Sequence, residues 1–147
     1  MIYLDTSFLM PLFRNEPVSQ QIENFLAACP AGSLAVSQWT RVEFASVIAR
    51  DVRMKALGET PALKLIEEFD ALASNSLHLW HPAVADFDLA RKFVSEFATK
   101  LRGPDALHLA IARNNGADEF LTLDDDLLLA ARRLKIKARR GIRSRRG

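Results

Sequence analysis

The sequence predicts an α/β fold, a single domain with a central, mostly parallel sheet of about five strands and helices on both faces. Short apolar runs alternate with segments of helical spacing along the chain, which is typical of a parallel sheet. The length of 147 residues suits one domain, which would bury ~70% of the surface of its unfolded chain. No internal repeat or interdomain linker interrupts the pattern.

The first half of the chain contains two expected strands and three expected helices. Apolar residues at intervals of three and four predict helices, and short apolar runs between turn residues predict strands. Gly58 is expected just after one helix, and Thr60 with Pro61 is expected to open the next as N-cap and first helical residue. The expected elements are a strand from residue 2 that ends within 5–7, a helix at 18–28, a strand at 33–37, and helices at 39–57 and 60–75.

The second half alternates strands and helices more regularly. Pro82 closes one strand, the Gly103-Pro104 pair separates two helices, and the run "NNG" stops the second of these helices. The expected elements are a strand at 77–80, helices at 84–100 and 104–114, a strand at 119–123, a helix at 125–134 and a short final strand at 135–138.

Composition predicts a cytoplasmic protein. Hydrophobic residues make up 49% of the chain and charged residues 26%, which is ordinary for a globular protein. The single Cys29 cannot form an intrachain disulfide, and a reducing compartment is the simplest setting for it. The apolar start "MIYLDTSFLMPLF" is interrupted by Asp5 and has no basic residues before it, so neither a signal peptide nor a membrane span is expected.

The charges are distributed unevenly along the chain. Residues 132–147 hold nine of the 20 Lys and Arg and no acid, so the preceding 131 residues carry a balance of −7. An acidic body with a basic end is compatible with a polyanion bound over a cation-dependent site, whereas a solvated end is the simpler explanation. We therefore divide the chain into a domain at 1–138 and a basic tail at 139–147, which would follow a polyanion, contact a partner or be disordered.

Four carboxylates are expected along one edge of the predicted sheet. Right-handed crossovers place the C-terminal ends of parallel strands at one edge, and ligands bind there in open α/β sheets. Asp5 and Asp124 directly follow strands, Glu43 lies one turn into the helix after a strand, and Asp105 lies in the first turn of a helix. Such a cluster needs a cation, and a set of oxygen ligands favours Mg²⁺ or Mn²⁺.

Each carboxylate also has a simpler explanation. Asp124 could cap the helix that starts at Asp125, and Asp105 could be an ordinary first-turn acid. Glu43 could pair with Arg41. Asp5 has no obvious capping role, so it favours a functional site most strongly. His108, one turn beyond Asp105, is expected to be a structural residue hydrogen-bonded beneath the cleft.

Three sequence segments together resemble the PIN domain. These are "YLDTSFLM" at the start, "TRVEFASVIAR" in the middle and "LRGPDALHLAIARNNGADEFLTLDDDLLLAA" near the end, and the resemblance covers residues 1–138. More narrowly, they resemble the toxin ribonuclease of VapBC-type toxin–antitoxin pairs. The resemblance implies that the catalytic, metal-binding quartet is Asp5, Glu43, Asp105 and Asp124.

The resemblance also suggests roles for neighbouring residues. It makes Ser7 and Thr122 polar supports of the site and Arg102 a contact for phosphate. Asp126, two residues beyond Asp124, is a candidate outer metal ligand. The ending "RRGIRSRRG" departs from the family pattern, because such toxins often end close to their last strand.

These residues predict a Mg²⁺-dependent endoribonuclease in which Mn²⁺ may substitute. The resemblance implies RNA cleavage to 5′-phosphate and 3′-hydroxyl ends, a cognate antitoxin, a homodimer and no membrane. A stand-alone RNA-processing nuclease and a non-catalytic adaptor of the same fold remain alternatives. A haloacid-dehalogenase-like phosphatase is disfavoured because Ser7 replaces its second aspartate, and a receiver domain is disfavoured because no acid directly follows the strand at 77–80.

Overall fold

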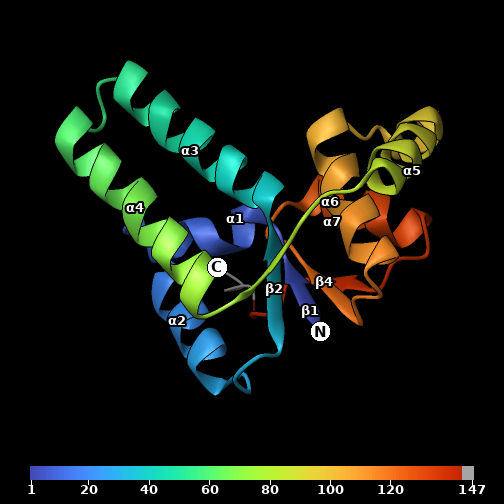
Figure 1. Ribbon diagram of the computed structural model, residues 1–147, viewed down its shortest axis with the longest axis horizontal. Helices are drawn as coiled ribbons and strands as arrows, with labels where there is room; N and C mark the ends of the chain where they lie inside the picture. The colour runs from blue at the N-terminus through green and yellow to red at the C-terminus, as the bar shows by residue number, and fades with distance from the viewer. Residues whose placement is uncertain (144–147) are drawn as a thin grey trace.

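The computed structural model describes residues 1–143 and contains one five-stranded sheet in the order β3-β2-β1-β4-β5 (Figure 1). Every pair of neighbouring strands is parallel, which confirms the predicted α/β class. β1 occupies the centre, with Tyr3 opposite Ala35 on one side and opposite Phe120 on the other. The strands are β1 (Ile2–Leu4), β2 (Leu34–Ser37), β3 (His78–Trp80), β4 (Glu119–Leu121) and β5 (Ala138–Arg139).

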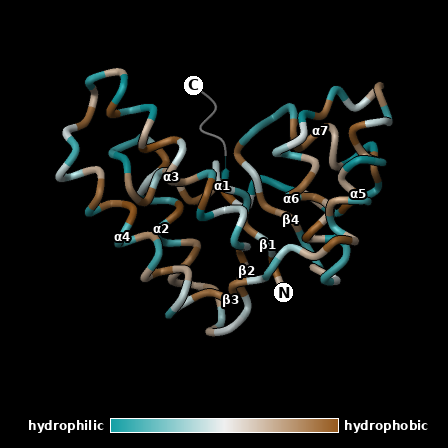
Figure 2. Tube along the Cα trace, turned by 45° about the horizontal axis from the view of Figure 1, so that its top comes forward, coloured by the Kyte–Doolittle hydropathy of each residue, from teal (hydrophilic) through white to brown (hydrophobic). Residues whose placement is uncertain are grey.

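Two groups of helices lie on opposite sides of the strands (Figures 1 and 2). One group is α1 (Thr6–Leu9), the 3-10 turn η1 (Met10–Leu12), α2 (Ser19–Ala28), α3 (Gln38–Arg53) and α4 (Glu59–Asn75). The other group is α5 (Val84–Ser95), η2 (Phe97–Thr99), α6 (Gly103–Asn114) and α7 (Asp125–Arg133).

Alternate strand residues supply the two cores. Tyr3 and Phe120 pack with the second group of helices, whereas Leu4 and Leu121 pack with the first. This alternation follows from the two-residue period of a strand, and it explains why strands buried on both faces are almost wholly apolar. Helices therefore cover both faces, as predicted.

Several helix ends differ from the sequence prediction because lysines take the left-handed backbone conformation that usually favours glycine. The helix expected at 39–57 ends at Arg53, since Lys55 has φ +57° and Ala56 N–H donates to Asp51 O over 2.9 Å. This is a Schellman closure. Gly58 consequently does not follow a helix; it is the N-cap of α4, which starts at Glu59 rather than after Thr60.

The other differences are shifts of boundaries. The helix expected at 84–100 divides into α5 and η2, and Lys100 ends η2 at φ +56°. The final strand begins at Ala138 rather than 135, because Lys135, at φ +59°, closes the end of α7. None of the helices in residues 1–143 is long and apolar enough to cross a membrane.

The C-terminal segment stays close to the domain beyond the predicted boundary at 138. Arg139 belongs to β5, and Ile142 packs against the core on the α1–α4 side. The described structure therefore continues through the first part of the expected tail. Residues 144–147, to which the expectation of disorder also applied, lie outside the described residues.

Candidate active site

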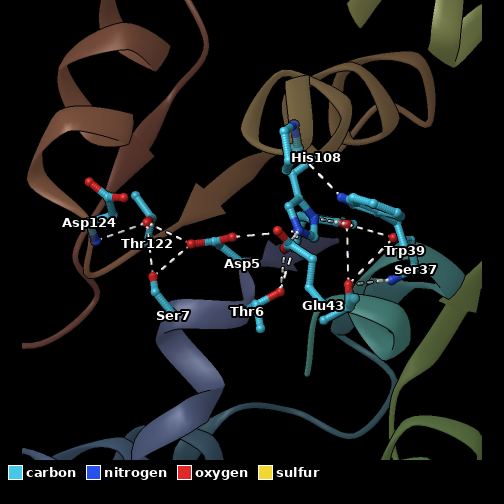
Figure 3. A network of polar contacts seen from close by, with 12 residues as sticks. Asp5, Thr6, Ser7, Ser37, Trp39, Glu43, His108, Thr122 and Asp124 are labelled. Atoms are coloured by element: carbon cyan, nitrogen blue, oxygen red, sulfur yellow. Dashed lines mark hydrogen bonds and ion pairs between the residues drawn. The ribbon is translucent and has the colours of Figure 1, made fainter. Parts of the chain in front are cut away.

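Asp5 is held at the C-terminal end of β1 by hydroxyl groups. Its backbone N–H donates to Leu121 O over 2.9 Å, and its side chain is almost wholly buried. Its Oδ2 accepts a hydrogen bond from Ser7 Oγ over 2.6 Å and another from Thr122 Oγ1 over 2.9 Å (Figure 3). Ser7 and Thr122 thus lie where polar supports of the site were expected. Two donors on one oxygen fix the direction in which the other oxygen points.

Glu43 projects from α3 toward the same place. Its Oε1 accepts a hydrogen bond from Thr6 Oγ1 over 2.8 Å and contacts His108 Nε2 (Figure 3). Arg41 pairs with Asp70 instead, with Nε 2.8 Å from Oδ1, so the alternative pairing with Glu43 is wrong. Burial opposes ionisation of Glu43, but the bonds from His108 and Thr6 hold its pKa below the usual value.

His108 lies fully buried beneath the two carboxylates, as expected for a structural histidine. Its Nδ1 is 2.7 Å from the Tyr3 hydroxyl, and its Nε2 is 3.7 Å from Asp5 Oδ1 as well as in contact with Glu43. Burial alone would lower the pKa of His108, yet Tyr3, Glu43 and Asp5 together raise it well above the usual value. A protonated His108 is therefore an internal cation that partly offsets the charge of the carboxylates.

Asp105 lies in the first turn of α6, half-buried beside the other acids. Burial and then repulsion by Asp5, Glu43 and Asp124 raise its pKa from 3.8 to about 6, against the opposing influence of His108. This repulsion indicates that all four predicted carboxylates converge. Asp105 is thus a first-turn acid of α6 that also lines the same cleft as the other three carboxylates.

Asp124 caps a helix and also lines the cleft. It is the N-cap of α7, where its Oδ1 accepts from Asp126 N over 2.9 Å and from Leu127 N over 3.2 Å. Its own N–H donates to Thr122 Oγ1 over 3.0 Å, which links it to the donors of Asp5 (Figure 3). The capping bonds engage Oδ1 and leave Oδ2 out of the cap.

The acids lie where two surface hollows meet. A hollow of about 840 Å³ is lined by all four carboxylates together with Arg14 and Arg50. A second, of about 680 Å³, shares Asp105 and Asp124 with the first and is lined by three cationic residues. These are Lys100, Arg102 and Arg133. Arg102 is exposed and Asp126 lines the same hollow, so each lies within the cleft but away from Asp5 and Glu43.

The donor set fits a divalent cation. Ligand atoms of Asp5, Glu43 and His108 lie within 4.8 Å of one another, and Asp105 and Asp124 extend the set outward. Burial and the neighbouring carboxylates both raise the pKa of Asp105, and His108 offsets only part of this effect. Oxygen-rich sites of this kind favour Mg²⁺ or Mn²⁺. The carboxylates would hold the cation.

Sequence reasoning missed two contributors to this arrangement. Thr6 holds Glu43, although it stands in the same "DTS" run as Asp5 and Ser7, which was the available signal. Tyr3 supports His108 from inside the core, and its hydroxyl also lies 2.8 Å from Ser37 Oγ. A tyrosine within an apolar strand reads as a core residue, so no sequence signal pointed to this role.

The family model of the PIN domain matches residues 2–133. The chain therefore belongs to the PIN domain family. A comparison with curated proteins found no match.

Solved structures with the same fold cover nearly the whole chain. VapC20 of Mycobacterium tuberculosis, described as a sarcin-ricin loop cleaving toxin, has a TM-score of 0.64 at 18% identity, over 86% of this chain and 92% of that one. FitAcB from Neisseria gonorrhoeae has a TM-score of 0.68 at 18% identity, over 94% and 96%. VapBC-1 from nontypeable Haemophilus influenzae has a TM-score of 0.65 at 15% identity, over 96% and 98%.

Proposed function

We propose that this protein is a divalent-metal-dependent endoribonuclease that uses Mg²⁺, with Mn²⁺ able to substitute. The observation that carries the proposal is the convergence of Asp5, Glu43, Asp105 and Asp124 in one cleft, where burial and then repulsion by the other three acids raise the pKa of Asp105 to about 6. Four acids that repel one another destabilise the protein unless a cation binds them. Membership of the PIN domain family supports the same conclusion.

The chain's own residues prepare the site in separate ways. Ser7 and Thr122 orient Asp5, while Thr6 and His108 orient Glu43. Asp105 must lose its proton before it can serve as a ligand, since a protonated carboxyl is a poor one. A bound divalent cation supplies activation of water and polarisation of the scissile phosphate.

Cations at the rim favour a polyanionic substrate. Lys100, Arg102 and Arg133 line one hollow. Arg50 lines the other, where Arg14 is paired with Asp51. Arginine and lysine at such positions contact phosphates and position the chain without reading its sequence. Arg102, next to Asp105, is the residue that we propose for the phosphate closest to the cleaved bond.

We further propose that the protein is the toxin of a toxin–antitoxin pair, acting in the cytoplasm as a homodimer. The supporting observation is the fold likeness to VapC20, which is described as a toxin, and to a structure described as a toxin–antitoxin complex from Klebsiella pneumoniae. Val42 on α3, Met54 directly after α3 and Leu63 on α4 are exposed apolar side chains, which suits a surface that a protein partner covers.

The test is cleavage of a mixed cellular RNA by the purified full chain. Cleavage is expected with Mg²⁺, and its loss is expected with EDTA, with Asp5→Asn and with Asp105→Asn. Asp88→Asn, an exposed acid on α5, is the matched control and should cleave normally. Cleavage that survives both EDTA and the two site variants would show that the acids are not a metal-nuclease centre. Growth arrest on expression, relieved by a neighbouring small gene, would distinguish a toxin from an RNA-processing nuclease.

A further inference from the structure

Residues 139–142, which belong to the expected basic tail, pack against the loop that carries Asp124. Thr122 N–H donates to Arg139 O over 3.2 Å, and Ile142 packs with the apolar side chains around Leu121. Gly141 has φ +73°, and an added Cβ would lie 3.0 Å from Leu121 Cδ1 and 3.1 Å from Phe8 Cε2. Close packing therefore fixes the path of this segment.

The side chain of Arg140 holds both residues that flank Asp124. Its Nη1 donates to Leu123 O over 3.0 Å and to Asp125 Oδ1 over 2.7 Å. Asp124 lies between these two anchored residues. Its backbone N–H is bound to Thr122, whose hydroxyl donates to Asp5. The guanidinium is thus connected to the centre of the site through one short loop.

The Arg140 side chain is placed at a cost to stability. Its Nε is buried and has no hydrogen-bond partner among the described residues. A buried, unpaired N–H of a charged group destabilises the folded state, and such groups in native proteins call for an explanation. An arginine retained for stability alone would leave Nε in solvent or paired, so a role in placing the loop explains it better.

Arg140 also separates the three consecutive aspartates. Asp124 lines both hollows and Asp126 lines one, whereas Asp125 lines neither and pairs with Arg140 instead. The Asp125 side chain remains 81% exposed, so the pair is not a buried core interaction. The guanidinium therefore draws Asp125 away from the cleft and leaves Asp124 as the member of the triplet that faces the other acids.

We propose that Arg140 is a positioning residue for the nuclease site: by holding Leu123 and Asp125 it fixes the loop that keeps Asp124 in the cleft, where Asp124 would complete the metal-binding set of Asp5, Glu43 and Asp105. This inference rests on the proposed function. It assigns residues 139–142 to the machinery of the site rather than to a separate tail.

The experiment compares three variants of the full chain with the wild type. Arg140→Gln removes the charge, whereas Arg140→Lys keeps the charge but replaces the planar guanidinium, whose Nη1 makes both bonds, with a flexible ammonium of different shape. Arg143→Gln, an exposed arginine of the same segment, is the matched control. Mn²⁺ affinity is measured by electron paramagnetic resonance, kcat and KM are measured on one RNA at several salt concentrations, and circular dichroism confirms that each variant is folded at the assay temperature.

Arg140→Gln is expected to weaken Mn²⁺ binding and to lower kcat by ~10–100-fold each, as is typical when a group that supports a metal ligand is lost. The KM of Arg140→Gln should stay within about threefold of the wild-type value, because losing the guanidinium affects the chemical step and not substrate binding. Arg140→Lys should fall between Arg140→Gln and the wild type, and Arg143→Gln should match the wild type in every measurement.

Two results would overturn the inference. The first is an Arg140→Gln protein with unchanged Mn²⁺ affinity, a higher KM, and a KM that depends less steeply on salt, by about one phosphate contact. This result would make Arg140 an RNA-binding residue. The other is an Arg140→Gln protein that matches the wild type throughout. A wild-type chain that neither binds Mn²⁺ nor cleaves RNA would refute the proposed function itself. If the wild type binds Mn²⁺ and the Arg140 variants bind Mn²⁺ and cleave RNA equally well, only the positioning role of Arg140 would be refuted.

Discussion

Replacing Asp105 with asparagine should stabilise the metal-free protein. The pKa of this carboxyl rises from 3.8 to about 6, so the folded state disfavours its ionised form by about two pKa units. At ~1.4 kcal/mol per unit the ionised side chain would cost ~3 kcal/mol, which solvent screening of the half-buried group reduces to ~1–2 kcal/mol. Asparagine has nearly the same shape and cannot ionise, so Asp105→Asn removes this cost.

The gain in stability from Asp105→Asn should appear only as the pH rises above about 4. A folded-state pKa above the unfolded value means that protonated Asp105 contributes stability below pH ~4, and this contribution is lost as the pH rises through about 6. The wild type and Asp105→Asn should therefore be equally stable near pH 4. Above pH ~6.5 the variant should be more stable by the full amount, which corresponds to ~3–8 °C in Tm for a domain of this size.

The assay is thermal unfolding in EDTA from pH 4 to pH 8, with Asp88→Asn on the exposed face of α5 as the matched control. The control should show no rise in Tm with pH relative to the wild type. Adding Mn²⁺ at pH 7.5 should raise the Tm of the wild type and leave that of Asp105→Asn almost unchanged, because ligand binding stabilises only a chain that can bind. A pH-independent difference, or a less stable Asp105→Asn at pH 8, would refute the reasoning.

Two further substitutions test the supports of the site. Tyr3→Phe should lower the free energy of unfolding in urea by ~1–3 kcal/mol, because it removes the hydroxyl that contacts buried His108 and Ser37. An unchanged urea midpoint would show that these contacts do not stabilise the protein. Gly141→Ala should cost ~1–3 kcal/mol, because its φ of +73° and its contacts with Leu121 and Phe8 leave no room for a Cβ. Gly103→Ala, where an added Cβ meets open space, is the matched control and should be neutral or stabilising.

Sequence patterns were sufficient for the sheet and for the convergence of the acids. Alternating strands and helices imply parallel strands, and parallel strands bring residues such as Asp5 and Asp124 to one edge. The helix ends at Lys55, Lys100 and Lys135 could not be read in the same way. Lysine rarely takes a positive φ, and the conformation is seen here together with backbone hydrogen bonds that close each helix end.

The contacts made by Thr6 and Arg140 were beyond the reach of the sequence for a different reason. Each depends on a partner at least 15 positions away, as Thr6 does on Glu43 and Arg140 on Asp125. Local patterns give the type of element but not which side chains meet across elements. For the same reason Arg140 reads as one charge in a basic run, although the structure shows it bound to the loop of the site.

The four acids differ in the groups that hold them in the protein. This difference decides which carboxylate gives up a proton when a metal binds. Hydroxyl groups hold Asp5, Thr6 and His108 hold Glu43, and backbone N–H groups hold Asp124. Asp105 bears the remaining repulsion, and its pKa near 6 places its proton within reach of ordinary pH changes. Metal binding should therefore release a proton chiefly from Asp105. The apparent metal affinity should fall as the pH drops below about 6, because Asp105 is then protonated, while the hydrogen bonds that hold the other three carboxylates are kept.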